Sequence, residues 1–305
     1  MANCIPRGTT RANTWAMTVW EQWATHRNTV IETRQDLYYP IPVHFNAEPV
    51  SVEKLDYWMS FFVMEVRRQD GACYPPNSLF NIVAAIQRCL RNLPQFADVA
   101  FFTKSSSFSR LRQALDCRIK EMTAAGVGVC VKRADPISPD DELALWNSGV
   151  MNMCTSKGLS YAVFFYNCKS FGLRGNTEHK NLDASQFVFV SSDEDSYILF
   201  NAWNSKTFNG RLEHRRFVPR SIKHFDNGDE RCVFKIFQLY LSMIPSSGPF
   251  YRKPLVSSFR FGNQCVGINK LSVYTKTMFK DAGIDTGDRR IVNHSGRVSC
   301  CTRVI

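Results

Sequence analysis

The sequence predicts a mainly helical α+β protein in which a small antiparallel sheet is set among helices. Three observations lead to this fold class: helical periodicity without a strand pattern over the first 126 residues, two β-rich runs after residue 174, and helical periodicity again from residue 233. The chain has 305 residues, 44% of them hydrophobic and 21% charged, which is the composition of a folded protein. This length suffices for two domains that each bury a core.

The first 126 residues are predicted to form four helices. Apolar residues recur every three or four positions, which gives each helix one face to bury; the segments are 13–27, 52–69, 79–90 and 106–125. A proline-rich turn at 74–78 starts the third helix, and Gly126 ends the fourth. In the first helix Trp15, Val19 and Trp23 share one face, which we interpret as facing a core rather than a ligand.

A linker is predicted at 127–138, because the stretch 126–139 carries glycines, two prolines and the Lys132-Arg133 pair. It separates a helical domain, 1–126, from a second domain, 139–305. In the second domain Ser138 is expected to cap a helix over 139–147 whose first turn is acidic. A further, largely buried helix is expected over 160–171.

The antiparallel sheet is predicted from three short runs. The runs 187–190 and 197–200 are rich in Val, Phe, Ile and Tyr and are separated by a polar turn. A third strand at 216–218 follows the turn-forming Asn209-Gly210 pair. Helices are then predicted over 233–243 and 269–282.

The chain is strongly basic. Its net charge is +11, and a division at residue 130 gives 14 basic and 11 acidic residues before it against 24 and 16 after it. The second part therefore carries +8, which favours a polyanion such as DNA or RNA, or an acidic membrane surface, as partner. Simple solubility explains such an excess equally well.

Several classes of protein are disfavoured by what the sequence lacks. No apolar stretch is long enough to span a membrane, and the first ten residues contain no signal-peptide core. The eleven cysteines form no C-x-x-C pair, so neither a zinc site nor a disulfide framework is indicated and a reducing, intracellular setting is expected. Phosphate-loop, dinucleotide, zinc-protease and serine-hydrolase motifs are absent, so no metal and no small-molecule cofactor is predicted.

Basic residues stand at a few suggestive places. Arg174 follows a buried helix and a glycine turn, and Lys206 follows the second predicted strand, at the tip of a hairpin. His294 and Arg297 form the sequence H-S-G-R, with Asn293 a candidate cap for a helix whose N-terminus would add backbone N–H groups for a phosphate. Each of these residues alone is a weak signal, because an H-x-x-R pattern arises easily by chance; only their combination and order are informative.

In that order around a three-stranded sheet, these residues resemble the catalytic domain of a tyrosine recombinase. The resemblance is closer to the crypton-type recombinases and to the host-gene domains derived from them, including the C-terminal domains of MYM-type zinc-finger proteins and of a glutamine-rich relative. The stretches that carry it are 63–79, 115–134, 171–182, 267–283 and 293–297. It implies a helical, SAM-like core-binding domain that clamps DNA, followed by a recombinase-like catalytic domain.

The resemblance also implies a chemistry: metal-independent phosphoryl transfer on double-stranded DNA in the nucleus. Arg174 and Arg297 would hold the scissile phosphate, Lys206 would protonate the leaving oxygen, and His294 would assist by proton transfer or hydrogen bonding. The predicted DNA contacts are made by Lys132, Arg133, Arg174, Lys206 and Arg297. The resemblance leaves open the oligomeric state on DNA, with a homo-oligomer as one option.

The nucleophilic tyrosine of that family has no counterpart here. The sequence ends eight residues after Arg297, and its last tyrosine is Tyr274. We therefore expect a DNA-binding protein that is inactive alone in strand transfer, because no phosphotyrosine intermediate can form. The alternatives are a domesticated chromatin or transcription interaction module without catalysis, and an active recombinase completed by further sequence.

Overall fold

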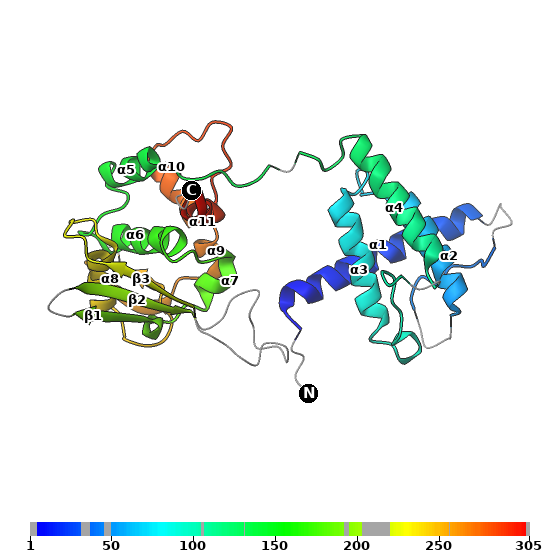
Figure 1. Ribbon diagram of the computed structural model, residues 1–305, viewed down its shortest axis with the longest axis horizontal. Coiled ribbons are helices and arrows are strands. Elements are labelled where there is room, and N and C mark those ends of the chain that lie inside the picture. Colours follow the sequence, from blue (N-terminus) through cyan, green and yellow to red (C-terminus); the bar gives the residue numbers. More distant parts are fainter. Residues whose placement is uncertain are drawn as a thin grey trace. The chain divides into compact units, whose positions relative to one another are not determined.

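The computed structural model describes residues 5–31, 37–45, 50–104, 107–130, 132–191, 195–202, 220–255 and 257–302. The chain divides into two compact units, residues 1–131 and 132–305 (Figure 1). Each unit has a hydrophobic core of its own. The first unit is helical and the second combines helices with two small antiparallel sheets. The predicted α+β class is therefore confirmed.

The first unit contains the four predicted helices and one short 3-10 helix. Their bounds are α1 Arg7–Ile31, α2 Val52–Glu65, α3 Pro76–Leu90, η1 Pro94–Phe96 and α4 Ser109–Ala124. Helix α1 extends beyond the predicted 13–27 at both ends, to Arg7 and Ile31. Helix α2 is four residues shorter than predicted, because Val66 takes up an extended conformation with ψ of 133°.

Aromatic side chains form the centre of the first core. Trp20 is fully buried, with its ring 5.1 Å from that of Trp23 and 5.4 Å from that of Phe62. The indole N–H of Trp20 donates to the backbone oxygen of Pro42, 3.0 Å away, which attaches the segment after α1 to this core. Trp15, which the helical pattern assigned to the buried face, is 45% exposed and contacts Tyr74 at the edge of the unit.

The second unit contains both sheets and the remaining helices. Its elements are α5 Pro139–Asn147, α6 Ser156–Lys169, α7 Gly175–Lys180, η2 Ala184–Gln186, β1 Phe187–Ser191, β2 Ser196–Ala202, β3 Arg220–Phe225, α8 Val233–Ser242, β4 Arg252–Pro254, β5 Phe261–Cys265, α9 Ile268–Leu271, α10 Tyr274–Asp281 and α11 Asn293–Thr302. Helix α5 has the predicted bounds, and Ser138 forms the predicted cap. The predicted 269–282 helix is interrupted at Ser272 and Val273, where one helix ends and the next is capped.

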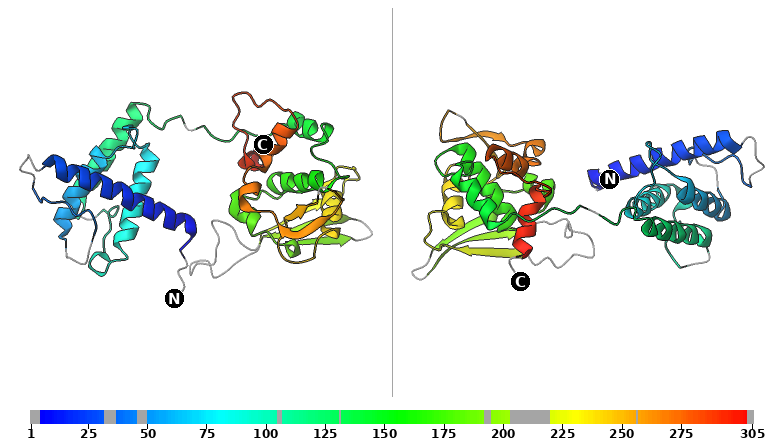
Figure 2. Two further views of the ribbon diagram at one scale, coloured as in Figure 1. Left: turned by 180° about the vertical axis from the view of Figure 1, so that it is seen from behind. Right: turned by 90° about the horizontal axis from the view of Figure 1, so that it is seen from above.

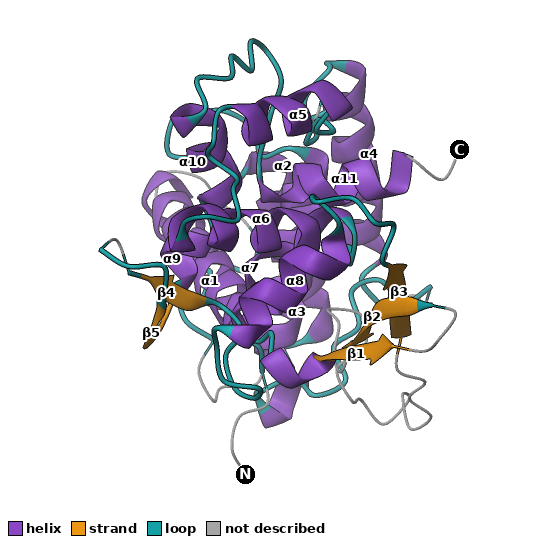
Figure 3. Ribbon diagram, turned by 90° about the vertical axis from the view of Figure 1, so that its left-hand side faces the viewer, coloured by secondary structure: helices purple, strands orange, loops and turns teal. Residues whose placement is uncertain are grey.

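The larger sheet has the strand order β1-β2-β3 and is antiparallel throughout, as predicted (Figure 3). The third strand predicted at 216–218 lies outside the described residues, and the strand that pairs with β2 is Arg220–Phe225. Alternation along the strands places Phe189, Ile198 and His224 in register. Ile198 is fully buried, and His224 packs edge-on against Phe171, so this face of the sheet meets the core.

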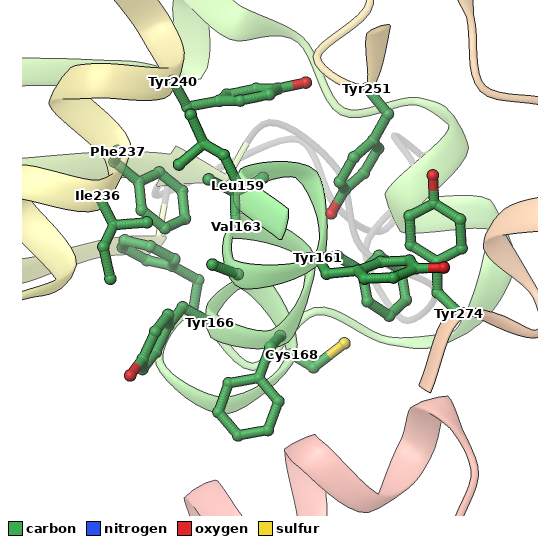
Figure 4. Close-up of a cluster of buried hydrophobic side chains, with 14 of the residues drawn as sticks. Leu159, Tyr161, Val163, Tyr166, Cys168, Ile236, Phe237, Tyr240, Tyr251 and Tyr274 are labelled. Carbon is green, nitrogen blue, oxygen red and sulfur yellow. The ribbon is translucent and has the colours of Figure 1, made fainter. Parts of the chain in front are cut away.

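Helix α6 runs through the middle of the second core (Figure 4). Every residue from Leu159 to Cys168 is buried, and α6 packs against α8, α10 and α11 (Figure 2). A helix that is buried all round is typical of the centre of a domain. The smaller β4-β5 hairpin and the short helix α7 were not predicted.

The start of α5 is anchored to the second unit from several sides. Burial acts to raise the pKa of Asp141, but hydrogen bonds from the Arg289 guanidinium and from the backbone N–H of Ser138 lower it below its usual value. Within the predicted linker 127–138, the backbone N–H of Asp135 donates to the oxygen of Arg290 at 3.1 Å, and that of Ile137 donates to Ser299 Oγ at 2.8 Å. The stretch 135–138 therefore belongs to the second unit rather than to a free linker.

Candidate anion-binding site

Arg174 lies at the start of α7, where a tight turn leaves α6. The turn depends on Gly172, whose φ of +61° falls in the left-handed region that glycine tolerates. The backbone N–H of Arg174 donates to Glu178 Oε2 at 2.6 Å, which ties the residue before α7 to a side chain of that helix. The Arg174 side chain is half-buried, and its guanidinium makes no hydrogen bond or ion pair with any residue that the structure describes.

Arg297 reaches the same turn from α11. Its guanidinium donates to the backbone oxygen of Gly172, two residues before Arg174 in the chain. A Cβ placed on Gly172 would lie 3.5 Å from Arg297 Nη1, so the arginine lies close against the turn. The structure thus brings the elements that carry Arg174 and Arg297 together, although 122 positions separate the two residues in the sequence.

The other residues of the N-H-S-G-R stretch fix the helix that carries Arg297. The Asn293 amide accepts from the backbone N–H of Thr275 and donates to the oxygen of Leu271, so it joins α11 to α9 and α10 instead of capping α11. Ser295 is fully buried, and its Oγ accepts from the backbone N–H of Val292 at 3.0 Å. The predicted capping role of Asn293 is therefore wrong.

The other predicted site residues are described to different extents. His294 is exposed on the first turn of α11 and contacts no other described residue through a hydrogen bond or ion pair. Lys206 lies outside the described residues, within the segment that joins β2 to β3. Lys132 and Arg133 are exposed just before the stretch that is anchored to the second unit.

His224 is a further residue at this turn, and the sequence patterns did not single it out. It lies on β3, and its Nε2 is 3.2 Å from the backbone oxygen of Ser170 at the end of α6. Burial lowers the pKa of His224, and the hydrogen bond to Ser170 acts in the opposite direction. Strand alternation from 220 onward would have assigned His224 to the inner face, but the predicted strand ended at 218.

The arrangement can hold an anion, because two arginines that lack a carboxylate partner among the described residues are carried by neighbouring elements. Guanidinium groups bind phosphate and carboxylate oxygens with paired N–H donors. Groups of three or more side chains that could hold a metal ion are absent from the described part of the chain. No helix in that part is long and apolar enough to cross a membrane.

Comparison with known proteins gives two matches that follow the two units. Residues 11–122 match the family described as the QRICH1 domain, and residues 136–262 match the family described as Domain of unknown function (DUF3504). The human protein named Uncharacterized protein KIAA1958 is 21% identical, over 98% of this chain and 42% of its own length. Its mouse homolog is 22% identical over 82% of this chain and 34% of its own length.

The human Zinc finger MYM-type protein 2 is 23% identical over 67% of this chain and 16% of its own length. The predicted resemblance to domains of MYM-type zinc-finger host genes is thereby confirmed as a sequence similarity, while the resemblance to recombinases stays a prediction. The chain spans less than half the length of each of these relatives.

Proposed function

We propose that this chain is a recombinase-like DNA-binding module that holds a backbone phosphate of double-stranded DNA between Arg174 and Arg297. The observation that carries the proposal is the hydrogen bond from Arg297, on α11, to Gly172, in the turn that leads into α7. Lys206, which the resemblance assigns to the same site, and His294, which is exposed on the first turn of α11, complete the proposed set of phosphate contacts. Lys132 and Arg133, in the predicted linker 127–138, add further contacts with DNA phosphates.

Charge supports DNA over a neutral partner. The second unit contains 24 basic and 16 acidic residues, a net charge of +8. Among the described residues Arg174 has no carboxylate partner, and a half-buried guanidinium is costly unless an anion neutralises it, because burial removes part of its hydration. A phosphate at Arg174 would supply that anion with the geometry that guanidinium prefers.

The proposal covers binding and not strand transfer. In the second unit, five of the six tyrosines, 161, 166, 240, 251 and 274, are at most 7% exposed. Burial raises the pKa of Tyr161 to about 12 and acts in the same direction on the other four. The sixth, Tyr197, is half-buried in the sheet beneath Lys223. Strand transfer would therefore need a nucleophile from another source.

A nuclear setting belongs to the same proposal. Its support is DNA as the proposed partner and the similarity to Zinc finger MYM-type protein 2. The origin that we propose is a crypton-type recombinase whose domains were retained in longer host proteins.

A second candidate function is a domesticated chromatin or transcription interaction module that no longer contacts DNA. The outer face of the larger sheet favours it, since Val188 is 43% exposed and Phe225 is 52% exposed. Exposed apolar side chains on one sheet face are typical of protein-binding surfaces. Under this alternative the two arginines would have no role in affinity for DNA.

The experiment is a titration of the full chain with a fluorescent 30-base-pair duplex at several salt concentrations. We expect Arg174→Ala to weaken binding about tenfold and to reduce the salt slope by about one, because each lost phosphate contact releases one counterion fewer. Lys253→Ala is the matched control: it removes an equal charge from an exposed position in β4 and should change affinity less than twofold. Equal effects of the two substitutions, or no binding by the wild type, would contradict the proposal.

A further inference from the structure

A buried chain of four polar side chains crosses the second core beside the proposed site. Asn167, Cys168, His179 and Tyr251 are each at most 3% exposed. Asn167 Nδ2 lies 2.9 Å from the Tyr251 hydroxyl, which lies 2.7 Å from His179 Nδ1. His179 Nε2 in turn lies 3.4 Å from Cys168 Sγ. Figure 4 shows Tyr251 and Cys168 in this part of the core.

The donors and acceptors fix the direction of this chain of bonds. The Tyr251 oxygen accepts from Asn167, and its own proton has His179 Nδ1 as its acceptor. In the tautomer with its proton on Nε2, His179 accepts from Tyr251 and donates to the sulfur of Cys168. Burial lowers the pKa of His179 to about 3 and raises that of Tyr251, so both groups are neutral at physiological pH.

These bonds join the two elements that carry the arginines. His179 lies on α7, five residues after Arg174, and its ring stacks on Phe164 of α6 with centroids 4.6 Å apart. Cys168 lies on α6 and faces α11, where a Cβ on Gly296 would be 2.7 Å from the Cys168 Cβ. Cys168 therefore touches the helix of Arg297 on one side and the helix of Arg174 on the other.

Helix α7 depends on such an anchor, because it has only six residues. A helix of fewer than two turns is unstable by itself in water, so tertiary contacts set the orientation of α7. His179 is the buried residue of α7 for which the structure gives polar partners on two other segments.

We infer that His179 and Tyr251 are positioning residues which hold α7 so that Arg174 faces the same anion as Arg297. The inference rests on the proposed DNA-binding function and assigns no contact with DNA to either residue. It predicts that the loss of one buried hydroxyl changes how the protein binds phosphate, in addition to its stability.

The test compares Tyr251→Phe with the wild type by hydrogen exchange and by DNA titration of the full chain. Tyr251→Phe keeps the ring and removes the hydroxyl that lies 2.7 Å from His179 Nδ1. We expect the amides of residues 177–181 to exchange at least tenfold faster and the salt slope of DNA binding to fall by about one. In an Arg174→Ala background the same substitution should change DNA affinity less than twofold, because the contact that it positions is already absent.

Tyr166→Phe is the matched control. Its hydroxyl is also largely buried, but it bonds Glu142 and Trp146 at α5, away from α7. This variant should lose stability without a change in the exchange of 177–181 or in the salt slope. Unchanged exchange in Tyr251→Phe, or an effect on affinity that persists in full in the Arg174→Ala background, would overturn the inference. If the wild type binds no duplex, the proposed function fails, and the exchange measurement alone decides whether Tyr251 holds α7.

Discussion

Gly296 determines how closely α11 approaches α6. A Cβ at this position would lie 2.7 Å from the Cys168 Cβ, which is closer than packed carbons tolerate. We expect Gly296→Ala to lower the free energy of unfolding by about 1–3 kcal/mol, as overpacking of a core usually does. Chemical denaturation measures this change.

The control for this substitution is Gly262→Ala in β5, where the nearest atom to an added Cβ is a leucine methyl at 3.5 Å, an ordinary contact. It should change stability by less than about 0.5 kcal/mol. If Gly296→Ala were as stable as the wild type, the two helices would have room to separate, and the geometry argued for Arg297 would lose its support.

His179 makes the stability of the second unit depend on pH. Burial lowers its pKa from 6.5 in the unfolded chain to about 3 in the fold, so between these values the unfolded state binds the additional proton. Stability from this group is complete above pH 6.5 and is lost as the pH falls. Between pH 7 and pH 5 this group alone lowers the free energy of unfolding by about 2 kcal/mol.

The measurement is denaturation of the wild type and of His179→Phe at both pH values. Phenylalanine can keep the stacking on Phe164 but has no proton to gain. Between pH 7 and pH 5 the free energy of unfolding of the variant should fall by about 2 kcal/mol less than that of the wild type. This difference does not depend on how stable the variant is at pH 7. Equal acid sensitivity of the two proteins would show that His179 does not titrate as its burial requires.

Residue chemistry made part of the candidate site predictable. Arginine is the side chain best suited to phosphate, so Arg174 and Arg297 could be named from the sequence. The roles of Asn293 and His224 could not, because an asparagine before a helix looks like a cap and a histidine in a strand looks like any other residue. Their partners lie on other elements and appear only in three dimensions.

At the scale of elements, Asp56 joins two helices of the first unit. It lies on α2 and is 7% exposed, and its carboxylate accepts the backbone N–H groups of Arg110 and Leu111 at the start of α4. Residue 108, at the position of the cap, offers no side-chain acceptor, so Asp56 supplies from another helix what a capping residue normally provides.

We expect Asp56→Ala to cost about 1–2 kcal/mol of stability, because it leaves buried N–H donors without an acceptor. Asp116→Ala, on the exposed face of α4 where the carboxylate pairs with Lys120, should cost less than about 0.5 kcal/mol. Denaturation followed by tryptophan fluorescence measures both. A loss in Asp56→Ala as small as in Asp116→Ala would mean that water satisfies the start of α4.

Elements with local signals were predictable, and elements held by distant contacts were not. Helix α5 begins with Ser138, Pro139 and an acidic turn, and these neighbours alone specify its start. Helix α7 has a short, polar sequence and is held by His179 from the core. The β4-β5 hairpin follows Tyr251, whose anchor is likewise a residue far away in the chain.

At the scale of the whole molecule, the two hydrophobic cores correspond to the two matched domain families. Tryptophan reports on them unequally, since Trp15, Trp20, Trp23 and Trp58 lie in the first unit and only Trp146 and Trp203 in the second. Two units with separate cores unfold as separate cooperative transitions unless an interface couples them.

Unfolding followed by tryptophan fluorescence should therefore report mainly the first unit, whereas circular dichroism reports both. Asp56→Ala, in the first unit, should shift the fluorescence transition to lower denaturant concentration. His179→Phe, in the second unit, should shift the circular dichroism transition of that unit and leave the main fluorescence transition unchanged. The same shift from both substitutions, with both probes coincident, would mean that the units unfold as one. In that case a substitution that destabilises the Gly172 turn would also destabilise the helical unit. A loss of affinity for DNA could then not be assigned to either unit alone.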